Sequence, residues 1–234
     1  MRRETAGTRG RKILSYLKKH LGDIRKLKVI EVGAGAGVYS LILAKYGASV
    51  ALLDYSREAL ALARNHFDSA GLSADFICAD ALKPEAGILG EFDAAMSFGT
   101  IEHYRYPQRL SMAQAHLALV KKYGVVVISV PNRWFLPHEI LKFYLQKRRK
   151  WHLGYEGAFT RMELFRLGKK LSLENKEIHG SGLITDILRY LDIIGRTRFL
   201  HRFFPAFPKN EIVNGPESHF DDLFGADIFL MGQK

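Results

Sequence analysis

Short apolar runs alternate with amphipathic segments along the first 131 residues of this 234-residue chain. The apolar runs are continuous, which is typical of strands buried on both faces of a parallel sheet. The segments between them repeat apolar residues at helical spacing. The pattern therefore predicts a doubly wound α/β sheet, with strands at 28–32, 48–53, 76–79, 92–98 and 125–130 and helices at 38–46, 57–69 and 108–122.

The alternation stops after Pro131-Asn132. Residues 132–160 are too many for a plain connection, contain an aromatic helix at 139–146, and follow the fifth strand, so they predict a lid and substrate pocket. A second insert, 183–208, is amphipathic and predicts a helix packed on this lid, with a membrane-surface role as the alternative. The remaining elements are a helix at 161–170 opened by a Thr160–Glu163 capping box, a strand at 175–179 and a last strand at 226–231.

The N-terminal segment carries its apolar residues on one helical face from residue 11 to residue 21, which predicts a helix packed against the domain or over the cofactor cleft. Residues 1–10 are charged and poor in apolar side chains, so we expect them to be disordered. The chain thus divides into a basic tail and helix, 1–27, and one domain, 28–234, that carries both inserts.

Net charge is +11 and lies in two patches. Residues 1–28 hold ten Lys/Arg against two acids, and residues 142–152 hold five Lys/Arg and no acid. Each patch is either a solvated surface or a site for an anionic partner, such as a membrane surface or nucleic acid. The single cysteine, Cys78, predicts a reducing compartment and is interpreted as a core residue. With no apolar run of about 18 residues, we expect a cytoplasmic protein, with a peripheral membrane role as the alternative.

The first strand runs into a glycine turn, Glu31-Val32-Gly33-Ala34-Gly35-Ala36-Gly37, and then into a helix. Glycines let the backbone turn sharply and approach a ligand closely. Dinucleotide sites use G-x-G-x-x-G, but here the third glycine comes one position early and Val38 takes its place. A carboxylate at Glu31 also suits a cationic amine better than a pyrophosphate.

This pattern resembles the first motif of the class I S-adenosylmethionine-dependent methyltransferases, E/D-x-G-x-G-x-G. The resemblance implies a Rossmann-like seven-stranded sheet whose last strand is antiparallel and inserts beside the fifth. It also implies S-adenosyl-L-methionine as cofactor. A carboxylate at Asp54, after the second strand, suits the ribose hydroxyls, although it is also placed to open the next helix. Asp80, after the third strand, most favours this family, whose members use an acid there for the adenine amino group. The implied cofactor site is Glu31, Gly33, Gly35, Gly37, Asp54, Tyr55, Asp80, Ala81, Leu82 and Phe98.

The segment after the fourth strand, Gly99–Tyr104, should face the glycine turn, because ligands of open α/β sheets bind where the strand order reverses. His103 is the best candidate for a general base and Glu102 a second catalytic candidate, although His103 is also placed merely to order this loop. We expect Tyr104, Trp134 and Tyr155 to enclose the acceptor. Some quinone-type members bind a metal through a glutamate where this chain has Gly99, so no metal site is predicted.

The favoured hypothesis is methyl transfer to a small-molecule or lipid-like acceptor. Two alternatives stay open: an RNA or protein methyltransferase that uses the basic patches, and a non-catalytic cofactor-binding or membrane-associated protein. A dehydrogenase conflicts with Val38 and Glu31. The oligomeric state has no sequence indicator.

Overall fold

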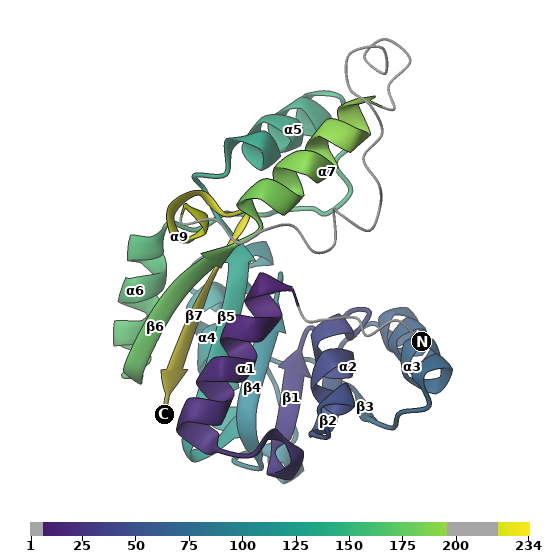
Figure 1. Ribbon diagram of the computed structural model, residues 1–234, viewed down its shortest axis with the longest axis vertical. Helices are drawn as coiled ribbons and strands as arrows, with labels where there is room; N and C mark the ends of the chain where they lie inside the picture. The colour runs from purple at the N-terminus through teal and green to yellow at the C-terminus, as the bar shows by residue number, and fades with distance from the viewer. Residues whose placement is uncertain (1–6, 196–219) are drawn as a thin grey trace.

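A seven-stranded sheet forms the centre of the computed structural model, which describes residues 7–195 and 220–234. The strand order is β3-β2-β1-β4-β5-β7-β6 (Figure 1). Strands β1 to β5 are parallel, and β7 is antiparallel to both β5 and β6. This confirms the predicted Rossmann-like sheet and the insertion of the last strand beside the fifth. The strands are β1 Lys28–Val32, β2 Ser49–Asp54, β3 Asp75–Cys78, β4 Phe92–Phe98, β5 Val120–Pro131, β6 Glu174–Ser181 and β7 Asp227–Gln233.

Helices cover both faces of the sheet because alternate strand residues point to opposite sides. In β1, Val29 joins the core beneath α1, α2 and α3, and Ile30 joins the core beneath α4 and α6. The helices are α1 Thr8–Leu21, α2 Val38–Lys45, α3 Arg57–Ala70, α4 Gln108–Leu119, α5 Leu136–Lys147, α6 Arg161–Lys170, α7 Leu183–Gly195 and α9 Asp221–Phe224, with short 3-10 turns η1 Ile24–Lys26, η2 Ala86–Ile88 and η3 Ile101–His103. No helix in the described ranges is both long and apolar enough to cross a membrane.

Helix α6 begins at the predicted capping box. The Glu163 N–H donates to Thr160 Oγ1 at 3.2 Å, and the Thr160 N–H donates to Glu163 Oε2 at 2.7 Å. Two backbone donors that a helix start leaves unpaired are thereby satisfied.

Helices α5 and α7 lie side by side beyond the carboxyl ends of the parallel strands (Figure 1). The Tyr190 hydroxyl of α7 is 2.8 Å from His138 Nδ1 of α5, and its ring packs edge-on against Phe135 with centroids 5.7 Å apart. These contacts agree with a helix packed on the predicted lid. Residues 196–208 of the second insert lie outside the described residues.

Three predictions about local structure are wrong. The expected disorder of residues 1–10 does not extend to Thr8–Gly10, which form the first turn of α1. The helix expected over 108–122 ends at Leu119, because Val120 already pairs with Phe92 in the sheet. Cys78 is exposed rather than part of the core, because β3 is the edge strand of the sheet.

Candidate functional site

The glycine turn after β1 is built from left-handed residues, with φ of 64° at Gly33, 52° at Gly35 and 66° at Gly37. A Cβ at Gly37 would lie 2.3 Å from Leu52 Cδ2, so this glycine is needed for packing of the turn on β2. A Cβ at Gly35 would meet no atom of the described residues within 4 Å. The turn is therefore open to a ligand at Gly35 and closed by packing at Gly37.

The Asp54 carboxylate at the end of β2 holds this turn. It is buried, and its two oxygens accept from the Gly35 N–H and the Ser56 N–H, each at 2.9 Å. Ser56 in turn caps α3 through the Ala59 N–H. Asp54 thus joins the glycine turn to the start of α3, and each of its oxygens keeps a further lone pair for a ligand.

Glu31 is buried within β1 and hydrogen-bonds to the first turn of α2. Its Oε2 accepts from the Ser40 N–H at 2.9 Å and the Ser40 hydroxyl at 2.6 Å. Burial raises the pKa of Glu31 to about 7, although the Ser40 hydrogen bonds act against this rise. A nearby cation would favour its ionised form.

The residues expected at the adenine edge follow β3. Asp80 is exposed, and its Oδ1 accepts from the Leu82 N–H at 2.9 Å. Ala81 is buried, whereas Tyr55 is 79% exposed. Tyr104 also belongs here: partial burial raises its pKa, and the charges of Asp80 and Asp54 act in the same direction.

The loops after β1 and β4 meet, as predicted. The Thr100 hydroxyl lies 3.2 Å from the Val32 carbonyl oxygen, and a Cβ on Gly33 would collide with the Thr100 side chain. At the end of β4, Phe98 stacks on Tyr39 of α2 with ring centroids 3.7 Å apart. The expected cofactor residues therefore gather at the carboxyl ends of β1, β2, β3 and β4.

Glu102 and His103, in η3, differ sharply in environment. Glu102 is 2% exposed, and its Oε2 has no hydrogen-bond partner among the described residues. Burial raises the pKa of Glu102 to about 8. His103 is exposed, and its Nδ1 lies 3.0 Å from the Tyr155 carbonyl oxygen. A hydrogen bond from Nδ1–H to that oxygen would leave Nε2 as the basic nitrogen.

The loop below the lid is fastened to the same segment. The Gly157 N–H donates to the Glu102 carbonyl oxygen at 2.9 Å, and Arg105 lies over the Tyr155 ring at 4.0 Å. The structure therefore brings Tyr155 to the catalytic candidates. The Trp134 side chain is 57% exposed, so its ring is not enclosed.

Two arginines of this region were not predicted. Arg9 of α1 pairs with Asp227, donates to Ser129 and Ser181, and lies 5.5 Å from the Tyr39 ring centre. Arg109 of α4 donates to the carbonyl oxygens of Glu102, Tyr104 and Gly157. The hydrogen-bond partners of Arg9 are 120 to 218 residues away in the sequence, so no local pattern indicates its role.

One cluster in the lid has side chains that metals bind: His138, Glu139 and Glu156. The ammonium of Lys142 lies among them, 2.6 Å from Glu139 and 3.7 Å from Glu156. Its positive charge occupies the place between the carboxylates and offsets part of their charge, so we interpret the cluster as an ion-pair network.

Comparison with known proteins adds an independent observation. Residues 29–124 match a family model described as a methyltransferase domain. The ubiquinone biosynthesis O-methyltransferase of Thiobacillus denitrificans is 31% identical over 157 residues, which cover 65% of this chain and 67% of that protein. The chain belongs to the class I S-adenosylmethionine-dependent methyltransferases. This family membership confirms the predicted cofactor, S-adenosyl-L-methionine.

Other matches are less extensive or less similar. The methyltransferase is 32% identical over 120 residues to the ubiquinone biosynthesis O-methyltransferase of Escherichia coli O157:H7, and spans about half of that protein (49%). The crystal structure of magnesium protoporphyrin IX methyltransferase from Synechocystis with bound SAH has a TM-score of 0.61 at 13% identity, covering 97% of this chain and 81% of that one. At that identity the likeness shows the fold alone.

Proposed function

We propose that this methyltransferase transfers the methyl group of S-adenosylmethionine to a small-molecule acceptor held between the loop after β4 and the lid. The observation that carries the proposal is the open glycine turn at Gly35, flanked by strand-end acids at Asp54 and Asp80. Similarity to two ubiquinone biosynthesis O-methyltransferases supports a small acceptor.

The residues at the strand ends fit the cofactor. We propose that Gly33, Gly35 and Gly37 form the floor beneath its methionine part and that Glu31 faces its amino group. A cation there would favour the ionised carboxylate of this buried residue. The carboxylate oxygens of Asp54 each keep a lone pair that suits the ribose hydroxyls. Tyr55 follows Asp54 and would lie beside the ribose.

The adenine edge follows from the same arrangement. The exposed Asp80 carboxylate has one oxygen committed to Leu82 N–H and the other directed to no residue of the described chain. We propose that it accepts from the adenine amino group, with Ala81 and Leu82 along the ring edge and Phe98 on the opposite wall.

The bound cofactor supplies a methyl group activated by its sulfonium. The protein's contribution is alignment in a dry site, worth up to about 7–11 kcal/mol in favourable cases. A hydroxyl acceptor must also lose a proton. We propose His103 Nε2 as the acceptor of this proton, since its hydrogen bond to Tyr155 orients the ring, and buried Glu102 as a second candidate. Tyr104 and Tyr155 would line the acceptor, with Trp134 entering only if the lid closes further.

Calorimetric titration with S-adenosylhomocysteine tests the cofactor site. We expect saturable binding that Asp80→Ala weakens about 10- to 100-fold, the usual range for a lost hydrogen bond to a charged group. Asp75→Ala is the matched control, because Asp75 is an exposed acid at the opposite end of β3. Binding of NAD in place of the homocysteine compound, or an unchanged affinity in Asp80→Ala, would overturn the proposed site.

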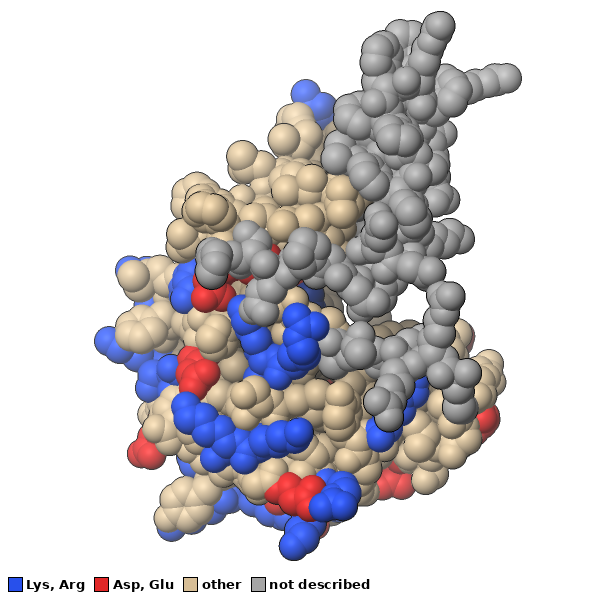
Figure 2. Space-filling view, in the orientation of Figure 1, with Lys and Arg blue, Asp and Glu red and all other residues tan. Residues whose placement is uncertain are grey.

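A second proposal concerns the lid surface. Helix α5 exposes Leu136, Ile140, Phe143 and Tyr144, each more than half exposed, and the run Lys147-Arg148-Arg149-Lys150 follows. Figure 2 shows the surface over α5 as largely uncharged, with a Lys or Arg at its upper tip. We propose that this face rests on an anionic lipid surface, because interfacial helices combine an apolar face with cations.

The N-terminal patch supports a solvated role instead. Three of its cations already face acids of the domain: Arg9 with Asp227, Lys12 with Asp222, and Lys19 with Glu177. Such pairs reduce the charge available to an anionic partner. The blue surface in the lower half of Figure 2, where Figure 1 places α1, is thus partly compensated.

Vesicle sedimentation tests the lid proposal. We expect binding to vesicles of phosphatidylglycerol and phosphatidylcholine but not to phosphatidylcholine alone, and loss of binding in Ile140→Ser/Phe143→Ser. Leu62→Ser on α3, also exposed, is the control. Equal sedimentation of the double variant, or retention on RNA in place of vesicles, would overturn it.

A further inference from the structure

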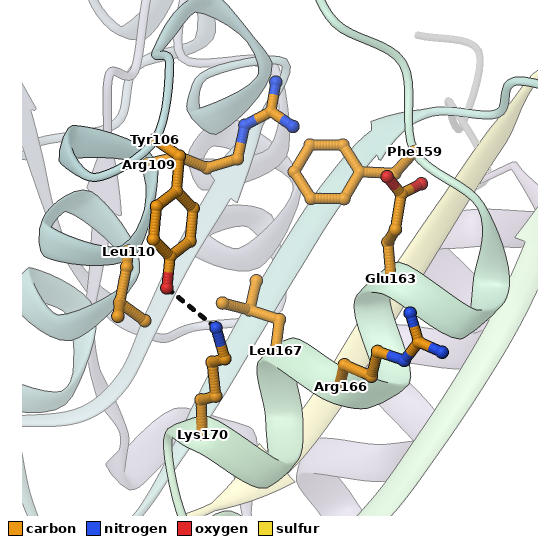
Figure 3. A pocket seen from close by; sticks show the side chains of 8 residues that line it. All are labelled: Tyr106, Arg109, Leu110, Phe159, Glu163, Arg166, Leu167 and Lys170. Atoms are coloured by element: carbon orange, nitrogen blue, oxygen red, sulfur yellow. Dashed lines mark hydrogen bonds between the residues drawn. The ribbon is translucent and has the colours of Figure 1, made fainter.

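A pocket lies between α4 and α6, away from the glycine turn (Figure 3). Its volume is about 190 Å³. Phe159, Leu110 and Leu167 provide its apolar lining, and Tyr106, Arg109, Glu163, Arg166 and Lys170 complete it. None of the residues expected to bind the cofactor lines it.

The charges around this pocket do not balance. Its one carboxylate, Glu163, is committed: Oε2 accepts from the Thr160 N–H and hydroxyl, and Oε1 lies 3.5 Å from Arg133. Glu163 therefore has little charge left for the cations of the pocket.

Among the described residues, no carboxylate pairs with the cations that line this pocket. Lys170 Nζ is 2.7 Å from the Tyr106 hydroxyl, a neutral group, as the dashed line in Figure 3 shows. Arg109 donates to three backbone carbonyl oxygens, and its guanidinium lies 4.3 Å from the centre of the Phe159 ring. Arg166 is exposed and forms no ion pair with any residue of the described ranges. The pocket thus presents an apolar wall beside uncompensated positive charge.

We propose that this pocket binds a small amphipathic carboxylate. The apolar body of the ligand would lie against Phe159, Leu110 and Leu167, and its carboxylate would meet the Lys170 ammonium, with Arg166 four residues earlier on α6 adding positive charge. Charge-assisted hydrogen bonds to these groups are stronger than neutral ones. The cavity is smaller than the roughly 300–1,000 Å³ of sites for drug-sized molecules, so it suits a short chain or a single ring.

The pocket backs onto the loop that carries the catalytic candidates. Arg109 lines the pocket and also holds the Tyr104 carbonyl oxygen at 3.0 Å and the Gly157 carbonyl oxygen at 3.1 Å. The site is nevertheless distinct, because no residue of the glycine turn lines it. The inference therefore stands independently of the proposed acceptor.

Titration calorimetry with four probes tests the ligand class. Octanoate has both an apolar chain and a carboxylate. 1-Octanol has only the apolar chain, and acetate has a carboxylate with a single methyl group. Inorganic phosphate represents a free anion. We expect octanoate to bind saturably and each other probe to bind at least about tenfold more weakly, since each lacks one of the two contacts.

Matched variants place the binding in this pocket. We expect Arg166→Gln/Lys170→Gln to weaken octanoate binding at least about tenfold through loss of charge-assisted contacts. Lys169→Gln, next to Lys170 in sequence but outside the pocket lining, should leave it unchanged. Equal affinity for octanol and octanoate, no octanoate binding, or an unaffected double variant would overturn the proposal.

Discussion

The Gly35 N–H donates to the Asp54 carboxylate at 2.9 Å, which joins the turn after β1 to the end of β2. This bond holds a left-handed residue at which an added Cβ would lie more than 4 Å from every neighbouring atom of residues 7–195 and 220–234. The turn is therefore preorganised before any ligand arrives.

Gly35→Ala should weaken cofactor binding while leaving the protein folded. The added methyl group would occupy the open side of the turn. An alanine held at the left-handed φ of residue 35 also costs about 1–2 kcal/mol of folding free energy. We expect a loss of S-adenosylhomocysteine affinity of at least about tenfold by calorimetry, equivalent to 1.4 kcal/mol.

Gly71→Ala is the control for Gly35→Ala. Gly71 caps α3 with φ of 66°, and a Cβ there would also meet nothing within 4 Å. It should show the same loss of stability in urea but normal affinity. If both variants bind normally, the turn does not contact the cofactor.

Glu102→Gln should change the pH dependence of stability. Burial raises the folded pKa of Glu102 to about 8, so its contribution to stability is full below its ordinary pKa and is lost as pH rises toward 8. One pKa unit corresponds to about 1.4 kcal/mol. The free energy of unfolding should therefore fall by about 4 kcal/mol between about pH 5 and pH 9.

Urea unfolding across that range measures this loss, and the variant should lack it. If Glu102 also accepts a proton during methyl transfer, the rate of the native enzyme should rise with a midpoint near pH 8 and the variant should show no such rise. A pH-independent stability of the native protein would contradict the first expectation.

His116→Leu should reduce sensitivity to acid. Burial lowers the folded pKa of His116 to about 4, and its Nδ1 is engaged with the Met112 carbonyl oxygen at 2.8 Å. Stability is complete above the unfolded pKa of about 6.5 and is lost as pH falls toward 4, by about 3 kcal/mol. Thermal unfolding in buffers across this window should show a smaller loss for the variant, and an equal loss would contradict the assignment.

Glu156→Gln should loosen the lid without affecting the cofactor. The Glu156 side chain is 5% exposed and lies 2.7 Å from His138 Nε2, and its charge faces the buried ammonium of Lys142. Removing one partner of a buried pair costs about 3–5 kcal/mol. We expect faster hydrogen exchange in α5 and unchanged affinity for S-adenosylhomocysteine.

Glu139→Gln is the matched variant for the lid, because Glu139 is the more exposed partner of Lys142. Its effect on exchange in α5 should be smaller. Equal exchange rates in Glu156→Gln and the native protein would show that the network does not hold the lid.

The sheet was predictable because its strands are local apolar runs. Strand β4 has the predicted limits, 92–98, and the capping box at Thr160 lies within four residues of sequence. The edge position of β3, which exposes Cys78, depends on strand order rather than on the residues of the strand. Local periodicity carries no information about that order.

Contacts between residues far apart in the sequence also could not be predicted. The start of β5 at Val120 is decided by its partner Phe92, and the place of Arg9 by Asp227. The strand-end acids were predictable, because the carboxyl ends of parallel strands share one edge of the sheet. The pocket between α4 and α6 was not, because separate segments line it.

The place of β7 has a consequence for synthesis. Strand β7 fills the space between β5 and β6, although both neighbours precede it in the chain. A nascent chain that has left the ribosome only as far as residue 195 therefore exposes one unpaired edge on β5 and another on β6, because β7 has not yet been made. Unpaired edges attract strands from other molecules. We expect ribosome-bound intermediates of this length to need a chaperone more than the finished chain does.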